Sequence, residues 1–460
     1  MRDRVHPALR RAILRQRERR PDGPAERAGF PAGASAPDPE LLDRGKYPDR
    51  GRATVRIKDM KTWAVANPPP HFGGPYWVFL KLTTDDGISG YGEAFGVPFA
   101  PARVRELIAD VVERHVIGVS PFQIESLWRV IYASGYSHHP ELTMGGVMSA
   151  IEIACWDIVG KALDQPVYNL LGGQVNERLR AYTYLYPPTT ATGETVIANL
   201  HGDAEVAPQR AAHYIDMGFT AVGFDPVMPM GSFDPRQIDL ESLDNAELVT
   251  RNIREAAGSK CDLLVKTHGQ MTTSSAIRLA RRLEPFDPLW FEEPTPPENR
   301  DEMARVAGST TIPVATGERL VSKYEFADVL GKQAAAILQP ALGRVGGILE
   351  GKKIAGMAEA HYAQMAPHLY AGPIEAAANI QLGTCIPNFL IQESIETFGG
   401  FYSDILKAPI QWQDGYIIPP TAPGIGIELN EDVADANPYT ENKLFPPMAD
   451  RPVVPEISDA

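Results

Sequence analysis

The sequence is poor in cysteine, with only Cys155, Cys261 and Cys385 among 460 residues. They lie far apart and lack the close spacing of metal ligands. This pattern indicates a reducing compartment, where buried cysteines pack as small hydrophobic side chains.

Long apolar runs and excess positive charge are also missing. The most apolar segment, 147–162, is interrupted by Glu152, Asp157 and Lys161, so no run of membrane-spanning length is expected. The arginines near the N-terminus precede no apolar core, which argues against a secretory signal. The net charge of −14 argues against a nucleic-acid partner. We therefore predict a cytoplasmic protein with no membrane or nucleic-acid partner.

Residues 1–52 differ in composition from the rest of the chain. Arginines are frequent in the first twenty positions, and a stretch rich in Pro, Gly and Ala follows them. A nucleic-acid or membrane arm is one interpretation. We favour a disordered basic extension, with at most a short amphipathic helix. From residue 53 onward the sequence is typical of a globular protein, with 44% hydrophobic and 22% charged residues overall.

Ionisable residues recur where apolar strands are predicted to end. The clearest case is 288–297, an apolar strand that runs into Glu292, Glu293 and a proline-rich loop. Similar endings carry Lys266, Glu318, His368 and Glu393, at intervals of roughly 25 residues or twice that, the length of one strand and one helix in a β/α barrel. Because the strand ends of such a barrel converge on one mouth, we predict one shared pocket.

The segment 179–395 is predicted to form a modified TIM barrel, (β/α)7β, because short apolar strands alternate with helical patterns. The expected strands are Leu179–Tyr184, Ala221–Phe224, Asp262–Lys266, Leu289–Glu292, Pro313–Thr316, Ala335–Gln339, Tyr362–Ala366 and Phe389–Glu393.

An α+β capping domain is expected over 53–178, with strands at 54–58, 61–65, 76–82 and 88–93 and helices at 101–116, 122–133 and 145–163. The segment 396–445 is predicted to return to this domain through strands near 416–418 and 424–429, and 446–460 is a proline-rich tail. Two irregular loops of the capping domain are either surface turns or substrate contacts. Their candidate substrate-binding residues are His71, Tyr136, His138 and His139.

The motifs of residues 54–430 resemble the mandelate racemase and muconate-lactonizing group of the enolase superfamily, nearest to its acid-sugar dehydratases. The matching segments are 155–163, 170–173, Phe291-Glu-Glu-Pro294, Thr316-Gly-Glu318, Arg344-Val-Gly-Gly347, His368 and Glu393. The resemblance implies an Mg²⁺ site at the ends of the third, fourth and fifth strands and abstraction of the proton α to a substrate carboxylate. It also implies a homo-oligomer.

The resemblance assigns roles to individual residues. Glu292 and Glu318 would bind Mg²⁺, and His368 would be the general base. Glu393, if protonated, would donate a hydrogen bond to the enediolate, and His268 would protonate the leaving 3-hydroxyl. Fixed positive charge must meet the developing dianion while the base removes the proton.

Three positions depart from the family pattern. Lys266 replaces the aspartate ligand of the third strand, Ala341 replaces the aspartate that pairs with the late histidine, and Gly223 replaces a lysine of the second strand. Two arrangements would compensate for Lys266. Asp225 would reach across as a third carboxylate, or the Lys266 ammonium would take the metal's place between Glu292 and Glu318.

Three hypotheses for function follow. The first is an Mg²⁺-dependent lyase that dehydrates a sugar acid. The second keeps proton abstraction but returns the proton, which gives a racemase, epimerase or cycloisomerase. The third is a non-catalytic carboxylate-binding homologue with Lys266 in the metal site, whose amine is otherwise either catalytic or part of a salt bridge.

Overall fold

The computed structural model describes residues 55–136, 138–190, 193–195, 200–227 and 235–444. The predicted N-terminal arm and the tail after residue 445 lie outside the described residues. The structural statements below concern the described residues only.

The N-terminal part forms a three-stranded antiparallel sheet in the order β1-β2-β3. Its strands are β1 (Ile57–Ala66), β2 (Tyr76–Thr84) and β3 (Ser89–Ala94). The sequence predicted two strands where β1 is one. The prediction was wrong because the polar residues between the two apolar stretches continue the pairing with β2.

Helices pack on this sheet, as the apolar periodicity predicts. They are α2 (Pro101–His115), α3 (Ile124–Tyr132), the short η2 (Ser134–Tyr136), α4 (Leu142–Leu163) and α5 (Val167–Leu170). Helix α4 lies so close to β3 that a Cβ added at Gly92 would be 1.8 Å from the Ala150 carbonyl oxygen. Glycine is therefore required there. By length and apolarity α4 could span a membrane, but 78% of its most apolar window is buried inside the protein, as in a core helix.

Eight parallel strands follow, in the positions that the sequence predicted within a few residues. They pair in the order β10-β9-β8-β7-β6-β5-β4, and β11 pairs with β4 in parallel. A single parallel bridge between Met365 and Phe389 links β10 to the segment before β11. The strands are β4 (Leu179–Tyr184), β5 (Ala221–Phe224), β6 (Asp262–Lys266), β7 (Trp290–Glu292), β8 (Val314–Thr316), β9 (Ile337–Leu338), β10 (Gln364–Met365) and β11 (Gln392–Ser394).

A ring of buried side chains fills the space enclosed by these strands. Each strand or its flank supplies one residue: Tyr182, Ala221, Leu264, Trp290, Ala315, Ile337, Ala366 and Ile391. Such a layer is the packed interior of a β/α barrel. The fold is thus a modified TIM barrel with an α+β capping domain, as predicted.

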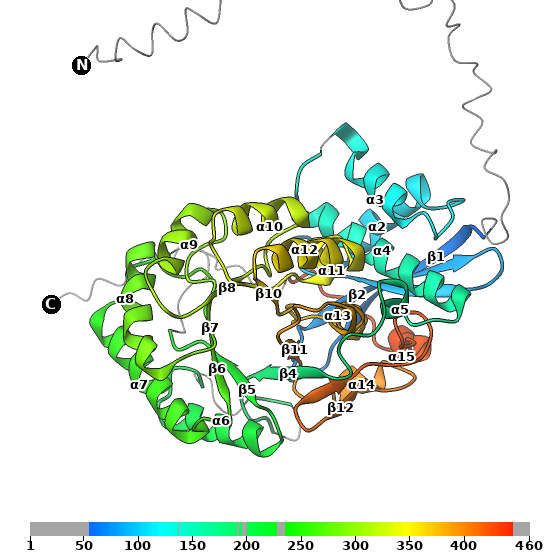
Figure 1. Ribbon diagram of the computed structural model, residues 1–460. Helices are drawn as coiled ribbons and strands as arrows, with labels where there is room; N and C mark the ends of the chain where they lie inside the picture. Colours follow the sequence, from blue (N-terminus) through cyan, green and yellow to red (C-terminus); the bar gives the residue numbers. More distant parts are fainter. Residues whose placement is uncertain (1–54, 137, 191–192, 196–199, 228–234, 445–460) are drawn as a thin grey trace, which may run out of the picture. The chain divides into compact units, whose positions relative to one another are not determined.

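Helices lie outside the strands, with α6 to α10 around β5 to β8 (Figure 1). The helices that connect successive strands are α6 (Val206–Asp216), α7 (Leu240–Ala257), α8 (Thr273–Leu283) with η3 (Glu284–Phe286), α9 (Arg300–Ala307), α10 (Ser322–Gly331), α11 (Leu342–Val345) with α12 (Ile348–Ala360), and α13 (Pro373–Cys385).

The segment after β11 corrects one prediction. Strand β13 (Tyr416–Ile418) pairs antiparallel with β4 of the barrel and with β12 (Gln411–Gln413), whereas the sequence predicted a strand in the capping domain. The stretch 424–429 forms no strand and makes isolated bridges only. After α14 (Phe401–Asp404), the chain returns to β1 through α15 (Glu431–Ala436) and a bridge from Pro438 to Val65.

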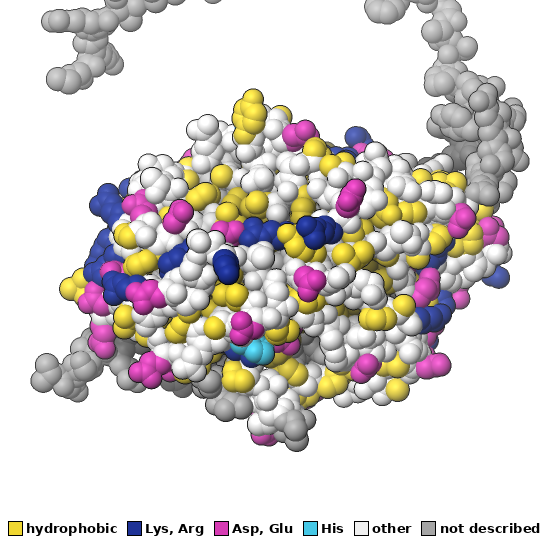
Figure 2. Space-filling model, turned by 60° about the horizontal axis from the view of Figure 1, so that its bottom comes forward, with side chains coloured by type: hydrophobic (Ala, Val, Ile, Leu, Met, Phe, Trp, Pro, Cys, Tyr) yellow, Lys and Arg dark blue, Asp and Glu magenta, His cyan; other side chains and the backbone are white. Residues whose placement is uncertain are grey.

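Charged side chains of both signs lie next to one another on the face shown in Figure 2. Many of the surface charges of the described residues belong to ion pairs, such as Arg103 with Glu106 and Arg114 with Asp110. Exposed pairs of this kind contribute little to stability, typically about 0–1 kcal/mol each.

Candidate active site at the strand ends

Ionisable side chains gather at the carboxyl ends of the barrel strands. Lys266 ends β6 and pairs in register with Glu292 at the end of β7. Glu393 of β11 pairs in register with Tyr182 of β4. Glu318 and His368 lie in the loops that follow β8 and β10. The parallel register therefore brings residues far apart in sequence to one mouth.

Lys266 lies at the centre of this cluster. Its ammonium donates hydrogen bonds to Glu393 Oε1 at 2.6 Å and to Tyr182 Oη at 2.9 Å, and it lies 3.3 Å from Glu292 Oε1. The side chain is only 4% exposed. Burial lowers the pKa of Lys266, but Glu292 and Glu393 raise it more, so the pKa lies well above its ordinary value. The amine is therefore a buried cation.

Gly223 makes room for this lysine. A Cβ added at Gly223 would be 2.7 Å from Lys266 Cδ and 3.3 Å from Tyr184 Cδ2. Real Cβ atoms do not approach other heavy atoms closer than about 3 Å without displacing them. Two of the three departures from the family pattern, Lys266 and Gly223, are thus linked. The side chain of Lys266 occupies the space that a Cβ at position 223 would need.

Glu292 is held from two sides. Its Oε2 accepts hydrogen bonds from Trp290 Nε1 at 2.9 Å and Gln339 Nε2 at 2.8 Å. Its Oε1 faces Lys266 and has no hydrogen-bond donor among the described residues. Burial raises the pKa of Glu292 to about 7, against the lowering effect of Lys266.

Glu393 is bonded as an acceptor on both oxygens. Oε1 accepts from Lys266, and Oε2 accepts from the Leu369 backbone N–H at 2.8 Å. The predicted role needs this residue to be protonated and to donate. That role stays a prediction, and it would require the Lys266 hydrogen bond to be released.

His368 is a buried imidazole beside a carboxylate. Its side chain is 8% exposed, and its Nε2 lies 3.6 Å from Glu318 Oε2. The ring stacks on Phe95, with centroids 5.4 Å apart. Its Nδ1 has no partner among the described residues, in line with Ala341 in place of an aspartate. Burial lowers the pKa of His368, although Glu318 and Glu393 oppose this. A neutral imidazole can accept a proton.

Glu318 carries a firmly ionised carboxylate. Burial by itself raises the pKa of Glu318, but His368, His268 and Arg319 lower it more, and the pKa falls to about 2. The neighbouring Glu293 is different in its contacts, because its Oε2 accepts two hydrogen bonds from Arg319, at 3.0 and 2.7 Å. Of the two carboxylates that end the predicted strand, only Glu292 contacts Lys266.

His268 lies at the more open side of the cluster, with 34% of its side chain exposed. Its Nδ1 is 3.4 Å from Asp225 Oδ2. Burial lowers the pKa of His268, but the hydrogen bond to Asp225 and the charge of Glu318 raise it more, to about 9. A protonated imidazole can donate a proton to a leaving group.

The residues present do not fit the predicted Mg²⁺ site. No group of three His, Cys, Asp or Glu side chains in the described part of the chain is arranged to hold a metal ion. Asp225, the predicted replacement ligand, is fully buried and bonded to Gln270 Nε2 at 2.5 Å, to the Val227 N–H at 3.1 Å and to His268. In the described geometry Asp225 is thus held by other groups, and its role as a replacement ligand stays a prediction.

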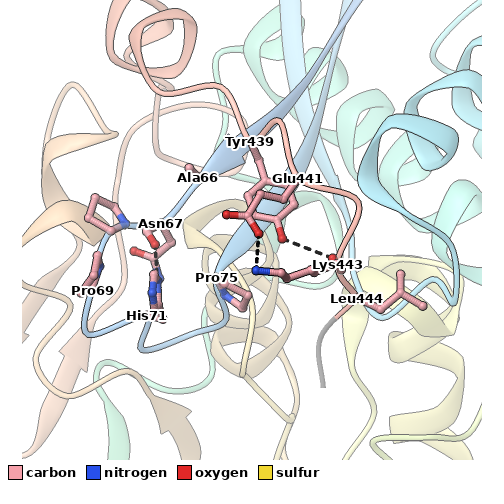
Figure 3. Close-up of a pocket in the computed structure, with 10 residues that line it drawn as sticks. Ala66, Asn67, Pro69, His71, Pro75, Tyr439, Glu441, Lys443 and Leu444 are labelled. Atoms are coloured by element: carbon pink, nitrogen blue, oxygen red, sulfur yellow. Dashed lines mark hydrogen bonds and ion pairs between the residues drawn. The ribbon is translucent and has the colours of Figure 1, made fainter. Parts of the chain in front are cut away.

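The predicted substrate contacts of the capping domain lie in two other places. Tyr136 is 99% exposed, His138 stacks on Tyr132, and His139 bonds the Pro140 carbonyl oxygen. His71 bonds the Asn67 carbonyl oxygen and lines a separate pocket of about 700 Å³ beside Tyr439 (Figure 3). No contact between these four residues and the Lys266 cluster is found among the described residues, so their role as substrate contacts stays a prediction.

Several site residues were missed from the sequence. Tyr182 accepts from Lys266, Gln339 donates to Glu292, and Tyr184 and His201 pack ring to ring at 4.5 Å with the Tyr184 hydroxyl and His201 Nδ1 unpartnered in the described structure. The alternating tyrosines at the end of β4 were the available signal, since alternate strand residues share a face.

Fold and strand-end chemistry together define a β/α-barrel enzyme with its candidate site under an α+β capping domain. Residues 73–172 match the model of the mandelate racemase/muconate lactonizing enzyme N-terminal domain, and residues 207–433 match the enolase C-terminal domain-like model. The chain belongs to the mandelate racemase and muconate-lactonizing group of the enolase superfamily, as the motifs predicted.

Individual relatives agree with this assignment. The chain is 35% identical to a D-galactonate dehydratase of Klebsiella pneumoniae (strain 342), over 82% of this chain and 93% of the relative. It is 36% identical to a D-galactonate dehydratase of Ralstonia nicotianae, over 78% and 90%. A solved structure of the mandelate racemase/muconate lactonizing type from Labrenzia alexandrii DFL-11 is 54% identical, with a TM-score of 0.83 over 87% of this chain and all of that one.

Proposed function

We propose that the protein is a sugar-acid dehydratase, a lyase that removes the proton α to a carboxylate and expels the 3-hydroxyl as water. The observation that carries the proposal is a pair of histidines in different environments around Glu318. His368 is buried against Phe95 beside Glu318, and His268 is bonded to Asp225 at the more open side. Relatives at 35% identity are named D-galactonate dehydratases, which supports the same reaction class.

Each histidine has one task in the proposed reaction. His368 accepts the α-proton, and the electron pair of the broken C–H bond moves toward the substrate carboxylate. His268 then gives a proton to the 3-hydroxyl as its C–O bond breaks, and the resulting enol becomes a 2-keto-3-deoxy acid. Separate acid and base environments allow both steps near neutral pH.

Mg²⁺ was predicted from the resemblance, and family members use it to stabilise the enediolate. The donor set described above does not match it, so no step is assigned to a metal here. Homo-oligomer formation and a cytoplasmic location also stay predictions.

Product analysis tests the proposal. The protein is incubated with D-galactonate and a panel of epimeric sugar acids, with and without added Mg²⁺, and 2-keto acid formation is measured. We expect turnover of at least one sugar acid, with His368→Asn and His268→Asn each lowering kcat by about 10²–10⁴-fold, the usual range for loss of an acid or base. His138→Asn and His139→Asn, in the exposed loop, are the comparison variants. A substrate contact there would raise KM without the loss of kcat that is expected for the His368 and His268 variants.

Two other outcomes would contradict the proposal. Exchange of the α-proton for deuterium in D₂O without a keto acid product would favour a racemase or epimerase. Binding of sugar acids with neither exchange nor product would favour a non-catalytic binding protein.

A further inference from the structure

Lys266 makes the contacts that a bound cation would make. Its ammonium donates hydrogen bonds to Glu393 and Tyr182 and forms an ion pair with Glu292, and these three residues come from β11, β4 and β7. The carboxylates of Glu292 and Glu393 are themselves nearly fully buried, at 1% and 5% side-chain exposure. Buried carboxylates need a positive partner, since an isolated buried charge is strongly disfavoured.

The charge count of the site is preserved by this substitution. Three carboxylates and one divalent cation, as in the family pattern, carry a net charge of −1. Glu393 occurs in both patterns and is left out of both sums, and the remaining two carboxylates, Glu292 and Glu318, with the Lys266 ammonium carry the same net charge. A divalent ion added to the present set would meet an ammonium 3.3 Å from one of its two candidate ligands. Like charges at such a distance repel strongly even where the medium is polarisable.

The residues around Lys266 leave space for its side chain and orient Glu292 toward it. Gly223 leaves space for its side chain, and Gln339 and Trp290 supply the donors that hold Glu292 Oε2, so that only Oε1 faces the ammonium. Asp225, the other nearby carboxylate, is occupied by Gln270 and His268. The lysine is therefore built into the site from several strands.

We infer that the Lys266 ammonium takes the place of a divalent cation in this site, so that the protein binds and turns over its carboxylate substrate without a metal ion. This inference rests on the proposed function. In this inference Lys266 fixes Glu292, Glu393 and Tyr182 and supplies positive charge that stabilises the developing enediolate. His368 and His268 move the protons, and no further co-reactant is required.

Calorimetry on the wild-type protein tests the inference directly. Protein dialysed against EDTA is titrated with MgCl₂ and MnCl₂ alone, and then with D-galactonate in EDTA or in excess Mg²⁺. We expect no saturable heat from either metal up to millimolar concentration, and D-galactonate affinity equal within twofold in the two buffers. Saturable metal binding in the micromolar range would overturn the inference.

Variants of Lys266 give a second test. Lys266→Asp restores a third carboxylate, so Mg²⁺ should now bind at least tenfold more tightly than to wild type and should raise the Tm of the variant but not that of wild type. Lys266→Gln keeps the length but removes the charge, and D-galactonate affinity should fall at least tenfold. Lys332→Gln, a surface lysine paired with Asp301 and Asp328, is the matched control and should change neither.

Different results would contradict the metal-free inference and the dehydratase proposal. Turnover that strictly requires Mg²⁺ would overturn the metal-free inference and leave the dehydratase proposal intact. Absence of turnover with every sugar acid, in EDTA and in Mg²⁺, would sink the proposed function, while the metal titrations would still decide whether Lys266 replaces the ion. A folded Lys266→Asp protein that binds no Mg²⁺ would contradict the inference.

Discussion

At the scale of single residues, the cluster depends on one buried positive charge. Removing one partner of a buried ion pair commonly costs about 3–5 kcal/mol, because the other partner is left unpaired. Lys266→Met would leave both Glu292 and Glu393 without their cation. We expect the free energy of unfolding to fall by about that amount, measured by urea denaturation at pH 8.

The control for this experiment is Lys332→Met, because Lys332 pairs with the exposed side chains of Asp301 and Asp328 and is itself 34% exposed. Its loss should change stability by no more than about 1 kcal/mol. A Lys266→Met protein as stable as the control would show that the lysine is not the charge partner described.

The absence of a side chain at Gly223 leaves the space that Lys266 occupies. Gly223→Ala places a methyl group 2.7 Å from Lys266 Cδ, and crowding of this kind costs about 1–3 kcal/mol. Lys266 would have to move, so ligand affinity should fall together with stability. Gly356→Ala is the matched control. Apart from the backbone of α12 itself, no atom of the described residues lies within 4 Å of a Cβ added there, and alanine favours a helix. Thermal melts and sugar-acid titrations of both variants check the prediction, and equal behaviour would refute it.

Residue-scale prediction from sequence was uneven for a physical reason. Lys266, Glu292 and Glu393 could be found because strand-end positions recur at the length of one β/α unit. Their mutual contacts could not be found, since these depend on the parallel register that sets Lys266 beside Glu292. Asp225 illustrates the limit, because the sequence did not indicate that it accepts a hydrogen bond from Gln270, and its role as a metal ligand stays a prediction.

At the scale of elements, carboxylates of the capping domain cap helices of the barrel. Glu152 of α4 accepts hydrogen bonds from the Ile348 and Leu349 N–H groups, at 2.7 and 2.8 Å, at the start of α12. Glu152→Ala leaves one buried and one half-buried N–H group without this partner, and we expect it to cost about 2–4 kcal/mol. Urea denaturation checks this.

Glu106→Ala is the matched control, because Glu106 lies on the exposed face of α2 and, among the described residues, pairs with Arg103. Its effect should stay within about 0.5 kcal/mol. A Glu152 variant that behaves like this control would mean that water or another residue satisfies the start of α12.

The positions of the strands were predicted better than the pairing between strands. The bounds of β4, β5 and β6 match the predicted ranges, because apolar runs bounded by turns are strong local signals. The later strands are shorter than predicted, and β13 pairs with β4 of the barrel. Partner choice is a long-range property, which no local pattern in residues 416–418 contains.

At the scale of the whole molecule, several buried carboxyl groups set how stability depends on pH. Burial raises the pKa of Glu93, Glu152 and Glu375 to about 8 each. The folded protein then binds protons that the unfolded chain releases above its ordinary carboxyl pKa of about 4.5. Stability therefore decreases as pH rises, wherever the native state binds more protons than the unfolded state.

The sign and the window follow from these pKa values. Below pH 4.5 each carboxyl group is protonated in both the folded and the unfolded state. Between pH 4.5 and about 8 the unfolded chain releases this proton while the folded protein keeps it, so the free energy of unfolding falls progressively. His268, with its pKa raised to about 9, acts in the same direction between its ordinary value of 6.5 and pH 9. We expect the Tm at pH 5.5 to exceed that at pH 8.5 by roughly 3 °C or more.

Glu375 offers the sharpest variant for this pH dependence, because neither of its carboxylate oxygens has a hydrogen-bond partner among the described residues. Glu375→Gln keeps the shape and removes the titration, so the decline of Tm between pH 5.5 and 8.5 should become shallower, with the largest gain over wild type at the alkaline end. Glu106→Gln, on the exposed face of α2, should leave the slope unchanged. If the Tm of the Glu375 variant and that of wild type decline in parallel, another group retains the proton in the folded state. Glu375 would then be ionised in the folded protein, with the charge of Arg344, which lowers the pKa of Glu375, outweighing the effect of burial.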